Sequence, residues 1–349
     1  MIGLFLIKLG VISSQLSSMV NAAISDTEHI VITEADNMPD LRNKKIIFAV
    51  ELGKAGISLP ILTLLSKLCG DGEDSLSGSI AGLLIRSSNE LYTKSFAQNF
   101  IFTANQLGCR FPGHPIVEAT GSLVNFLTWK KQTDMSAVDI CIALCKKLGQ
   151  RISNDNPVPV KSPNILALHS SFRKTSNTLE LWHMTSKHLT ACNITELHVE
   201  NGDVLDCKGC SYKTCIHYSM QNSCFYGGIM INDILPALEK SDAVVWICPN
   251  YNDSISANLT AVINRLTALY RKISFYNKTM FSVIVSGNSG SDSVAKQLIG
   301  ALNINKGFSL PPYFAIMATA NDKGQIKKVV DIQNKAKYFA KNMIDEIKA

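Results

Sequence analysis

Hydroxyl and cationic side chains are concentrated in residues 169–178, directly after a largely apolar run at residues 164–168. The stretch reads HSSFRKTSNT and offers five hydroxyls and two cations. The apolar run predicts a buried strand, so the polar stretch would lead from a strand to the N-terminus of a helix. Unpaired N–H groups and the positive end of the helix dipole are found there, and together with hydroxyls and Arg173 they favour phosphate binding. An ordinary capping loop rich in Ser and Thr is the alternative.

Two further loops with unusual compositions follow predicted buried strands. Residues 249–254 read PNYNDS, and residues 286–290 read SGNSG. Proline fixes a turn, an aromatic ring can contact a planar ligand, and glycine lets the backbone approach a ligand closely. In an open parallel sheet, ligands bind beyond the C-terminal ends of the strands. The three loops therefore predict one binding site at that edge.

Four of the ten cysteines are clustered with the spacing C-x2-C-x4-C-x8-C. They are Cys207, Cys210, Cys215 and Cys224. Four thiolates can bind a 4Fe–4S cluster or a tetrahedral zinc ion, and thiols at such spacing can instead be free or redox-active. The spacing therefore predicts a metal or redox role and leaves these alternatives open.

The composition indicates a globular protein of two domains. The chain has 349 residues, 46% of them hydrophobic and 18% charged, which is enough to bury a sizeable core. The net charge of +6 is scattered, which argues against a nucleic-acid-binding protein. No stretch approaches the roughly 20 apolar residues of a membrane span, and cysteines in a chain that needs no disulfides indicate a reducing compartment. We therefore expect a cytoplasmic protein.

The first 25 residues open with an apolar run that Lys8 interrupts early. No basic segment precedes the run, and the residues from Gln15 onward continue a helical period. We interpret this segment as an amphipathic helix, with a secretory signal as the alternative.

Buried strands and helices alternate along the chain, which predicts parallel sheets with helical crossovers. A proline-rich stretch without periodicity, residues 154–163, interrupts this alternation. We therefore predict an N-terminal α/β domain over residues 1–153, a linker over 154–163 and a second domain over 164–349. The second domain has five predicted strands, the number in a small doubly wound sheet. Those strands are residues 164–168, 194–197, 243–247, 280–285 and 313–317.

The stretches SSFRKTSNT, CPNYNDSISANLTAVINRL and VSGNSG and the cysteine cluster resemble flavodoxin-like NAD(P)H-dependent FMN reductases, in particular their iron–sulfur flavoprotein branch. The resemblance covers roughly residues 164–319. Two departures are visible: serines stand at positions 170 and 176, where the family usually has glycine, and the third cysteine gap is longer than in that branch. A loop carrying His217, Tyr218 and Met220 would have to bulge out there.

The resemblance implies which residues bind FMN. Its phosphate would be bound by the first loop, and its ring would lie between the other two. The phosphate-binding residues would be Ser171, Arg173, Ser176, Asn177 and Thr178. The residues beside the ring would be Pro249, Asn250, Tyr251, Asn252, Ser286, Gly287 and Gly290. The cysteines Cys207, Cys210, Cys215 and Cys224 would bind a 4Fe–4S cluster.

The resemblance further implies a function and its alternatives. The protein would be an FMN-dependent oxidoreductase that takes hydride from NAD(P)H as co-substrate and reduces a quinone, a flavin or another small-molecule or protein acceptor. An iron–sulfur flavoprotein that carries electrons is one alternative, and a flavodoxin-fold binding module without a cofactor is another. The likeness also implies a homo-oligomer. We assign no catalytic residue, because the flavin itself supplies the redox chemistry and a lone histidine such as His169 is more often structural.

The two halves are faintly alike, so we interpret the N-terminal domain as a degenerate copy of the second. Its predicted strand at residues 46–50 is followed by residues 51–56, ELGKAG, rather than by hydroxyls. An acidic residue at that position disfavours a phosphate. We therefore expect the N-terminal domain to bind no flavin and to have an accessory role.

Overall fold

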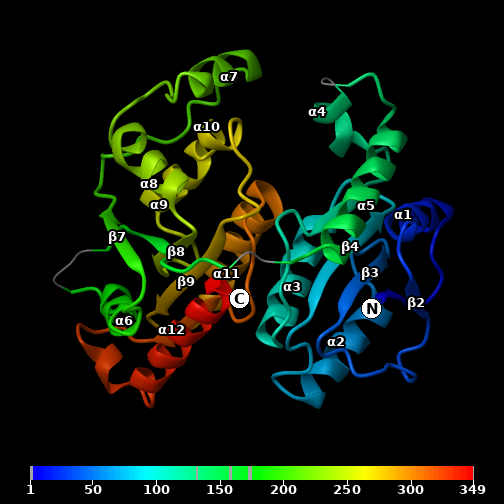
Figure 1. The fold of residues 1–349 in the computed structure, drawn as a ribbon, viewed down its shortest axis with the longest axis horizontal. Helices are drawn as coiled ribbons and strands as arrows, with labels where there is room; N and C mark the ends of the chain where they lie inside the picture. The colour runs from blue at the N-terminus through cyan, green and yellow to red at the C-terminus, as the bar shows by residue number, and fades with distance from the viewer. Residues whose placement is uncertain (1–2, 131–132, 157–158, 172–174, 349) are drawn as a thin grey trace. The chain divides into compact units, whose positions relative to one another are not determined.

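The computed structural model describes residues 3–130, 133–156, 159–171 and 175–348. The chain divides into two compact units, Met1–Asn156 and Pro157–Ala349 (Figure 1). Each unit has one sheet of five parallel strands with helices packed against it. No helix in the described ranges is long and apolar enough to cross a membrane.

The C-terminal unit is a doubly wound sheet, as predicted. Its strand order is β10-β9-β8-β6-β7, and every pair is parallel. The strands are β6 (Asn164–His169), β7 (Asn193–His198), β8 (Ala243–Pro249), β9 (Thr279–Ser286) and β10 (Ala315–Thr319). The chain begins in the sheet at β6, adds β7 on one side and then returns to add β8 on the other. This reversal of direction is the switch point at which doubly wound sheets bind ligands.

Helices connect these strands and cover the sheet. They are α6 (Asn177–Ser186), α7 (Tyr212–Met220), α8 (Leu235–Lys240), α9 (Ala257–Arg265), α10 (Thr267–Tyr270), α11 (Ser291–Leu298) and α12 (Ile332–Lys348), with π-helical turns at Met230–Ile234 and Ile299–Ile304 and a 3-10 turn, η4 (Gln325–Lys328). On one face, Trp182 of α6 and Phe339 of α12 pack in a core with Val245 and Phe281 from the strands. Residues that alternate with these, such as Trp246, are also fully buried. Burial on both faces explains why the strands are continuous apolar runs.

The N-terminal unit has the same topology. Its strand order is β2-β1-β3-β4-β5, so in both units the second strand along the chain lies at one edge and the first lies beside it. The strands are β1 (Leu4–Lys8), β2 (His29–Ile32), β3 (Lys45–Leu52), β4 (Ile80–Ser87) and β5 (Ile116–Ala119). The helices are α1 (Ser14–Ile24), α2 (Leu59–Asp71), α3 (Thr93–Gln106), α4 (Leu127–Lys130) and α5 (Ala137–Ser153), with a 3-10 turn at Val124–Phe126. The shared order is what a degenerate copy would show.

The prediction of a helix at the N-terminus is wrong for the residues before Ser14. Leu4–Lys8 forms a strand that pairs with both β2 and β3, and Leu4 and Ile7 are completely buried. A short apolar run is ambiguous between strand and helix, and here pairing on both sides decides for a strand. The helix begins only at Ser14, where the hydroxyl of Ser13 accepts a hydrogen bond from the N–H of Leu16 at 3.3 Å.

Gly149 permits close packing of α1 against α5, and it generates the first prediction. A Cβ at this position would lie 1.8 Å from the carbonyl oxygen of Ala23. We expect Gly149→Ala to lower the free energy of unfolding by about 1–3 kcal/mol, because the two helices must separate. Gly70→Ala on α2, whose Cβ would meet nothing within 4 Å, is the control and should be neutral or stabilising by up to about 1 kcal/mol. Urea unfolding of both variants is the measurement, and equal stabilities would contradict the packing argument.

Candidate functional site

The loop between β6 and α6 contains a buried hydroxyl without a partner. Ser171 is 1% exposed, and its Oγ makes no hydrogen bond within the described part of the chain. Ser176 is the N-cap of α6, and its hydroxyl accepts a hydrogen bond from the N–H of Leu179 at 3.1 Å. The predicted contact of Arg173 lies outside the described residues. Two hydroxyl residues, Ser171 and Ser176, therefore lie in the loop that leads from the end of β6 to the start of α6, as a phosphate-binding loop requires.

Asn177 and Thr178 form the first turn of α6 and are both buried. The side-chain amide of Asn177 donates hydrogen bonds to the carbonyl oxygens of Ala320 at 3.2 Å and Asp322 at 2.9 Å. Its amide oxygen accepts a longer hydrogen bond, 3.4 Å, from the N–H of Ile326. Because this side chain is already used to hold the 320–326 segment, only the backbone N–H of Asn177 remains for an anion.

A tight turn follows Pro249 at the end of β8. The backbone of Tyr251 and Ser254 makes reciprocal hydrogen bonds of 3.3 and 3.1 Å. Asn252 and Asp253 between them both have positive φ, 53° and 58°, which is the signature of a type I′ turn. Asn and Asp tolerate this conformation better than other non-glycine residues. The turn leaves the side chain of Tyr251 55% exposed and available to a ligand.

Asn250 ties this turn to the loop after β9. Its side-chain amide donates to Oγ of Ser286 at 3.0 Å and to the carbonyl oxygen of Ser289 at 3.1 Å. Gly290 lies against the turn with φ +90°, and a Cβ there would lie 1.9 Å from Oδ1 of Asp253. Glycine is favoured at this position, because L side chains rarely adopt this positive φ and a Cβ would also displace the Asp253 carboxylate. The structure therefore brings the second and third predicted loops together.

Contacts that the sequence did not predict complete the rim of strand ends. The hydroxyls of Ser170 and Ser256 are 2.6 Å apart, which joins the β6 loop to the start of α9. A Cβ on Gly287 would lie 2.9 Å from Oδ1 of Asn321, so the β9 loop approaches the segment after β10. The β10 loop could have been found from the sequence, because it too follows a predicted strand. Ser256 carried no signal apart from its place before a helix.

His169, the last residue of β6, is fully buried and stacks on His198, with ring centroids 4.6 Å apart. Its Nε2 lies 3.6 Å from Oε1 of Glu196 on the neighbouring strand. Oε2 of Glu196 also accepts from the indole N–H of Trp182 at 3.0 Å and lies 3.1 Å from Nε2 of His183. The imidazole of His169 and, to a lesser extent, the charge of His183 and the indole of Trp182 outweigh burial and lower the pKa of Glu196 to about 2.

Glu196 should therefore contribute a pH-dependent share of the stability. Its pKa in the folded chain lies below the usual 4.5, so the contribution is complete above that pH and is lost as the pH falls towards 2. We expect Glu196→Gln to be less stable than the wild type at pH 6, with the difference shrinking between pH 4.5 and pH 2. Chemical unfolding across this range measures it, with Glu28→Gln, an exposed carboxylate, as the control. A difference independent of pH would show that the charge is not what matters.

The four clustered cysteines are free thiols around α7. Cys215 lies on α7, while Cys207 and Cys210 precede this helix and Cys224 follows it. The bulging loop expected here is wrong: Ser211 accepts a hydrogen bond from the N–H of Thr214 at 3.2 Å and so caps a helix. Among the described residues, no group of three or more His, Cys, Asp or Glu side chains could hold a metal ion. The predicted 4Fe–4S cluster and a zinc site therefore gain no support from the structure.

Helix α9 is hydrogen-bonded to both ends of the cysteine-rich segment, residues 199–227. Its Asn258 donates to the carbonyl oxygen of Val199 at 3.0 Å. Arg265, which is 2% exposed, donates to the carbonyl oxygen of Gly227 at 2.9 Å. Because α9 starts beside Ser256, one helix links the rim of strand ends to the segment that contains the cysteines.

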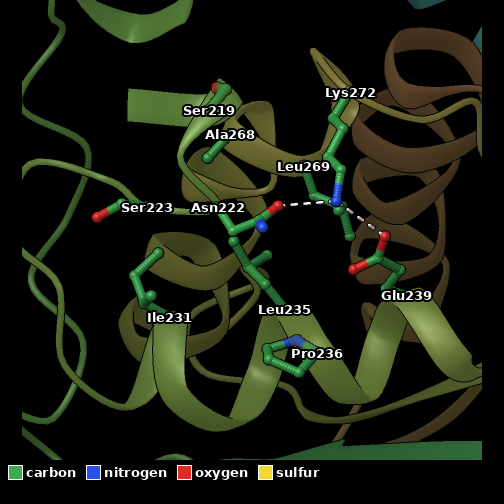
Figure 2. A pocket seen from close by; sticks show the side chains of 10 residues that line it. All are labelled: Ser219, Asn222, Ser223, Ile231, Leu235, Pro236, Glu239, Ala268, Leu269 and Lys272. Atoms are coloured by element: carbon green, nitrogen blue, oxygen red, sulfur yellow. Dashed lines mark hydrogen bonds and ion pairs between the residues drawn. The ribbon is translucent and has the colours of Figure 1, made fainter. Parts of the chain in front are cut away.

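The hollows in the C-terminal unit lie at different places relative to these loops. Figure 2 shows a cavity whose lining includes Leu235 and Leu269. Its volume is about 80 Å³. In its wall, Nζ of Lys272 donates hydrogen bonds to Asn222 at 2.7 Å and to Glu239 at 3.2 Å. No residue predicted to bind flavin lines it, and ligand sites usually measure about 300–1,000 Å³. An open hollow of about 660 Å³ instead starts at Thr175 and Ser176 and runs along α6, and its lining includes three lysines. These are Lys187, Lys323 and Lys327.

A comparison with known families finds a match in the C-terminal unit. Residues 163–322 match the sequence profile of the family described as NADPH-dependent FMN reductase. The matched stretch includes every residue predicted to bind flavin, and it supports a flavin-dependent oxidoreductase in general. It does not identify the iron–sulfur branch, and it leaves the acceptor unspecified. No curated protein matches the sequence significantly.

Solved structures with a similar arrangement of elements cover about half of this chain. An azoreductase from Bacillus anthracis str. Sterne has 11% sequence identity and a TM-score of 0.39, and the likeness covers 53% of this chain and 99% of that chain. An NAD(P)H:quinone oxidoreductase from Methanothermobacter marburgensis has 11% identity and a TM-score of 0.37, covering 52% and 99%. A flavodoxin, WrbA-like protein from Agrobacterium tumefaciens has 14% identity and a TM-score of 0.35, covering 54% and 100%.

Proposed function

We propose that the C-terminal unit binds FMN and that the protein is an FMN-dependent NAD(P)H oxidoreductase. Its acceptor would be a quinone, a free flavin or another small molecule or protein. The observation that carries the proposal is the buried hydroxyl of Ser171, which has no hydrogen-bond partner among the described residues. It lies in the loop that leads to α6, inside the stretch that matches the FMN reductase family.

The residues at the start of α6 fit a phosphate group. The backbone N–H groups of Asn177 and Thr178 belong to the first turn, where a helix leaves donors unpaired and places the positive end of its dipole. Ser171 adds a buried hydroxyl that has no hydrogen-bond partner among the described residues. Burying such a group is costly unless a ligand accepts a hydrogen bond from it. Lys323 lines the hollow that starts at Thr175 and Ser176 and adds positive charge there. Of the other two lysines, Lys187 follows the last residue of α6, and Lys327 is paired with Glu180 at 2.5 Å. A dianionic group would therefore be stabilised here.

The turn at residues 249–254 and the loop at residues 286–290 fit the flat ring. Tyr251 is half exposed at the rim, and Gly287 and Gly290 let these loops pack closely against Asn321 and Asp253. Asn250 fixes the spacing of the two loops through its bonds to Ser286 and Ser289. When bound, FMN supplies hydride acceptance and electron transfer, while the residues of this chain bind and orient it. We assign no side chain of the protein as general acid or base.

The proposal leaves the four cysteines without a cluster. The described residues bring no three potential ligands together, so nothing in the fold favours an iron–sulfur electron carrier over a flavin reductase. An iron and sulfide assay on anaerobically purified protein separates the two functions.

The function is tested by reconstituting the full chain with FMN and following oxidation of NADPH and of NADH with a quinone as acceptor. We expect FMN to bind and to make the chain oxidise at least one nucleotide, while the FMN-free chain does not. A chain that binds no FMN would be a binding module rather than a reductase. A chain that binds FMN but oxidises neither nucleotide would contradict the proposed reaction.

Ser171→Ala tests the phosphate cradle. A lost hydrogen bond to a charged group costs about 1.5–3 kcal/mol, so the Kd for FMN should rise about tenfold to a hundredfold. The Kd for riboflavin, which lacks the phosphate, should stay unchanged. Ser186→Ala, at the other end of α6, is the control and should alter neither Kd. An equal loss of affinity for FMN and riboflavin would mean that Ser171 does not contact the phosphate.

A further inference from the structure

In the N-terminal unit, a carboxylate lies at the start of the first helix. Oε2 of Glu51 accepts hydrogen bonds from the backbone N–H of Ser13 at 3.0 Å and from its hydroxyl at 2.8 Å. Ser13 is the N-cap of α1, just as Ser176 is the N-cap of α6 in the other unit. Glu51 is a residue of β3 and not of the loop after it, so it reaches α1 from the neighbouring strand. The sequence interpretation placed this acid in the loop after the strand at residues 46–50, whereas Glu51 still belongs to that strand.

Strand pairing shows that Glu51 occupies a position equivalent to one at the proposed flavin site. Lys8 of β1 pairs with Ala49 of β3, and in the other unit His169 of β6 pairs with Ile247 of β8. Two residues further along each second strand lie Glu51 and Pro249. Pro249 begins the loop proposed to lie beside the flavin ring. The carboxylate therefore stands at the same end of the sheet and at the same switch point.

The loop before α1 provides no cradle of its own. Residues 9–12 separate β1 from Ser13 and read LGVI, whereas residues 170–175 separate β6 from Ser176 and read SSFRKT. The first loop is shorter and has neither a hydroxyl nor a cation. The N–H of Ser13, the residue before α1, therefore needs an acceptor from elsewhere, and Glu51 supplies it.

A cation fixes Glu51 in this place. Oε1 of Glu51 lies 2.9 Å from Nη1 of Arg86 on β4, and both side chains are about three-quarters buried. Glu51 thereby joins the ends of two adjacent strands, β3 and β4, to the start of α1 through one carboxylate. Other acids are similarly used along this edge: Glu118 accepts from the hydroxyl of Thr93 at the start of α3, and Glu90 accepts from the N–H of Ser122. An incoming phosphate would meet fixed negative charge and would find its donors already engaged.

We propose that Glu51 is the resident anion of the N-terminal unit. It takes the place that a phosphate ester takes in the C-terminal unit, closes this unit to phosphate-bearing cofactors and limits the chain to one flavin. The comparison with a phosphate rests on the proposed function, whereas the contacts of Glu51 do not. Removal of its side chain therefore uncovers an anion site between Ser13 and Arg86, and the site takes a small tetrahedral oxyanion.

The test uses the full chain with Glu51→Ala and inorganic sulfate as the probe. Hydrogen exchange of residues 14–17 in α1 is followed in sulfate and in chloride at equal ionic strength. We expect exchange there to be faster in Glu51→Ala than in the wild type, and sulfate at ten times its Kd to slow it about tenfold. Chloride should have no such effect, and the wild type should not respond in this helix. Glu28→Ala is the matched control and should behave as the wild type. It also removes one carboxylate, an exposed one directly before β2.

Glu51→Ser keeps the proposal testable if Glu51→Ala does not fold. Its short side chain leaves the anion site open, so exchange in α1 should be faster than in the wild type, and sulfate should slow it. The proposal is overturned if neither variant responds to sulfate more than to chloride, or if wild-type chain binds two flavins. A chain that binds no flavin, with sulfate still slowing exchange in the Glu51 variants, would refute the proposed function and leave this inference standing.

Discussion

A helix that follows the first strand of a doubly wound sheet begins with backbone N–H groups that its own carbonyls cannot satisfy. Both units of this protein have such a helix at the switch point of the sheet, and most features of the two strand-end rims follow from how that need is met. In the C-terminal unit, Ser176 caps the helix, and the buried hydroxyl of Ser171 has no partner in the described part of the chain. In the N-terminal unit, Glu51 supplies a carboxylate from the neighbouring strand. The same electrostatic demand is thus met from within one sheet, and in the other it is left to the proposed ligand.

Hydrogen bonds between its loops fix the rim of the C-terminal unit. Asn250 joins the loops after β8 and β9, Ser170 meets Ser256, and Asn177 holds the segment after β10. Positive φ at Asn252 and Asp253 and the lack of a Cβ at Gly290 allow the backbone to come this close. Loops fixed in this way need little ordering when a ligand binds, and a smaller entropic cost favours affinity.

The family match covers residues 163–322, and the cysteine-rich segment lies inside it without forming a recognisable metal site among the described residues. Helix α9 attaches this segment to the rest of the unit through Asn258 and the buried Arg265. Because the same helix begins after Ser256 on the rim, the segment is anchored to the edge proposed to bind flavin, whatever its thiols do. The flavin chemistry and the role of the cysteines are therefore separate questions.

The sequence alone determined the parallel sheets and the position of the rim. Continuous apolar runs such as residues 243–247, alternating with segments of helical period, indicate strands buried on both faces, and in such sheets polar stretches after the strands gather at one edge. Tertiary structure decided the rest, because it depends on contacts between residues far apart in the chain. Pairing with β2 and β3 made Leu4–Lys8 a strand, and this placed Glu51 beside Ser13, 38 residues away. Likewise, the amide of Asn177 is engaged by carbonyl groups more than 140 residues away. Hydrophobic periodicity depends on neighbouring residues and can be read from the sequence directly. It does not indicate which residues far apart in the chain come into contact.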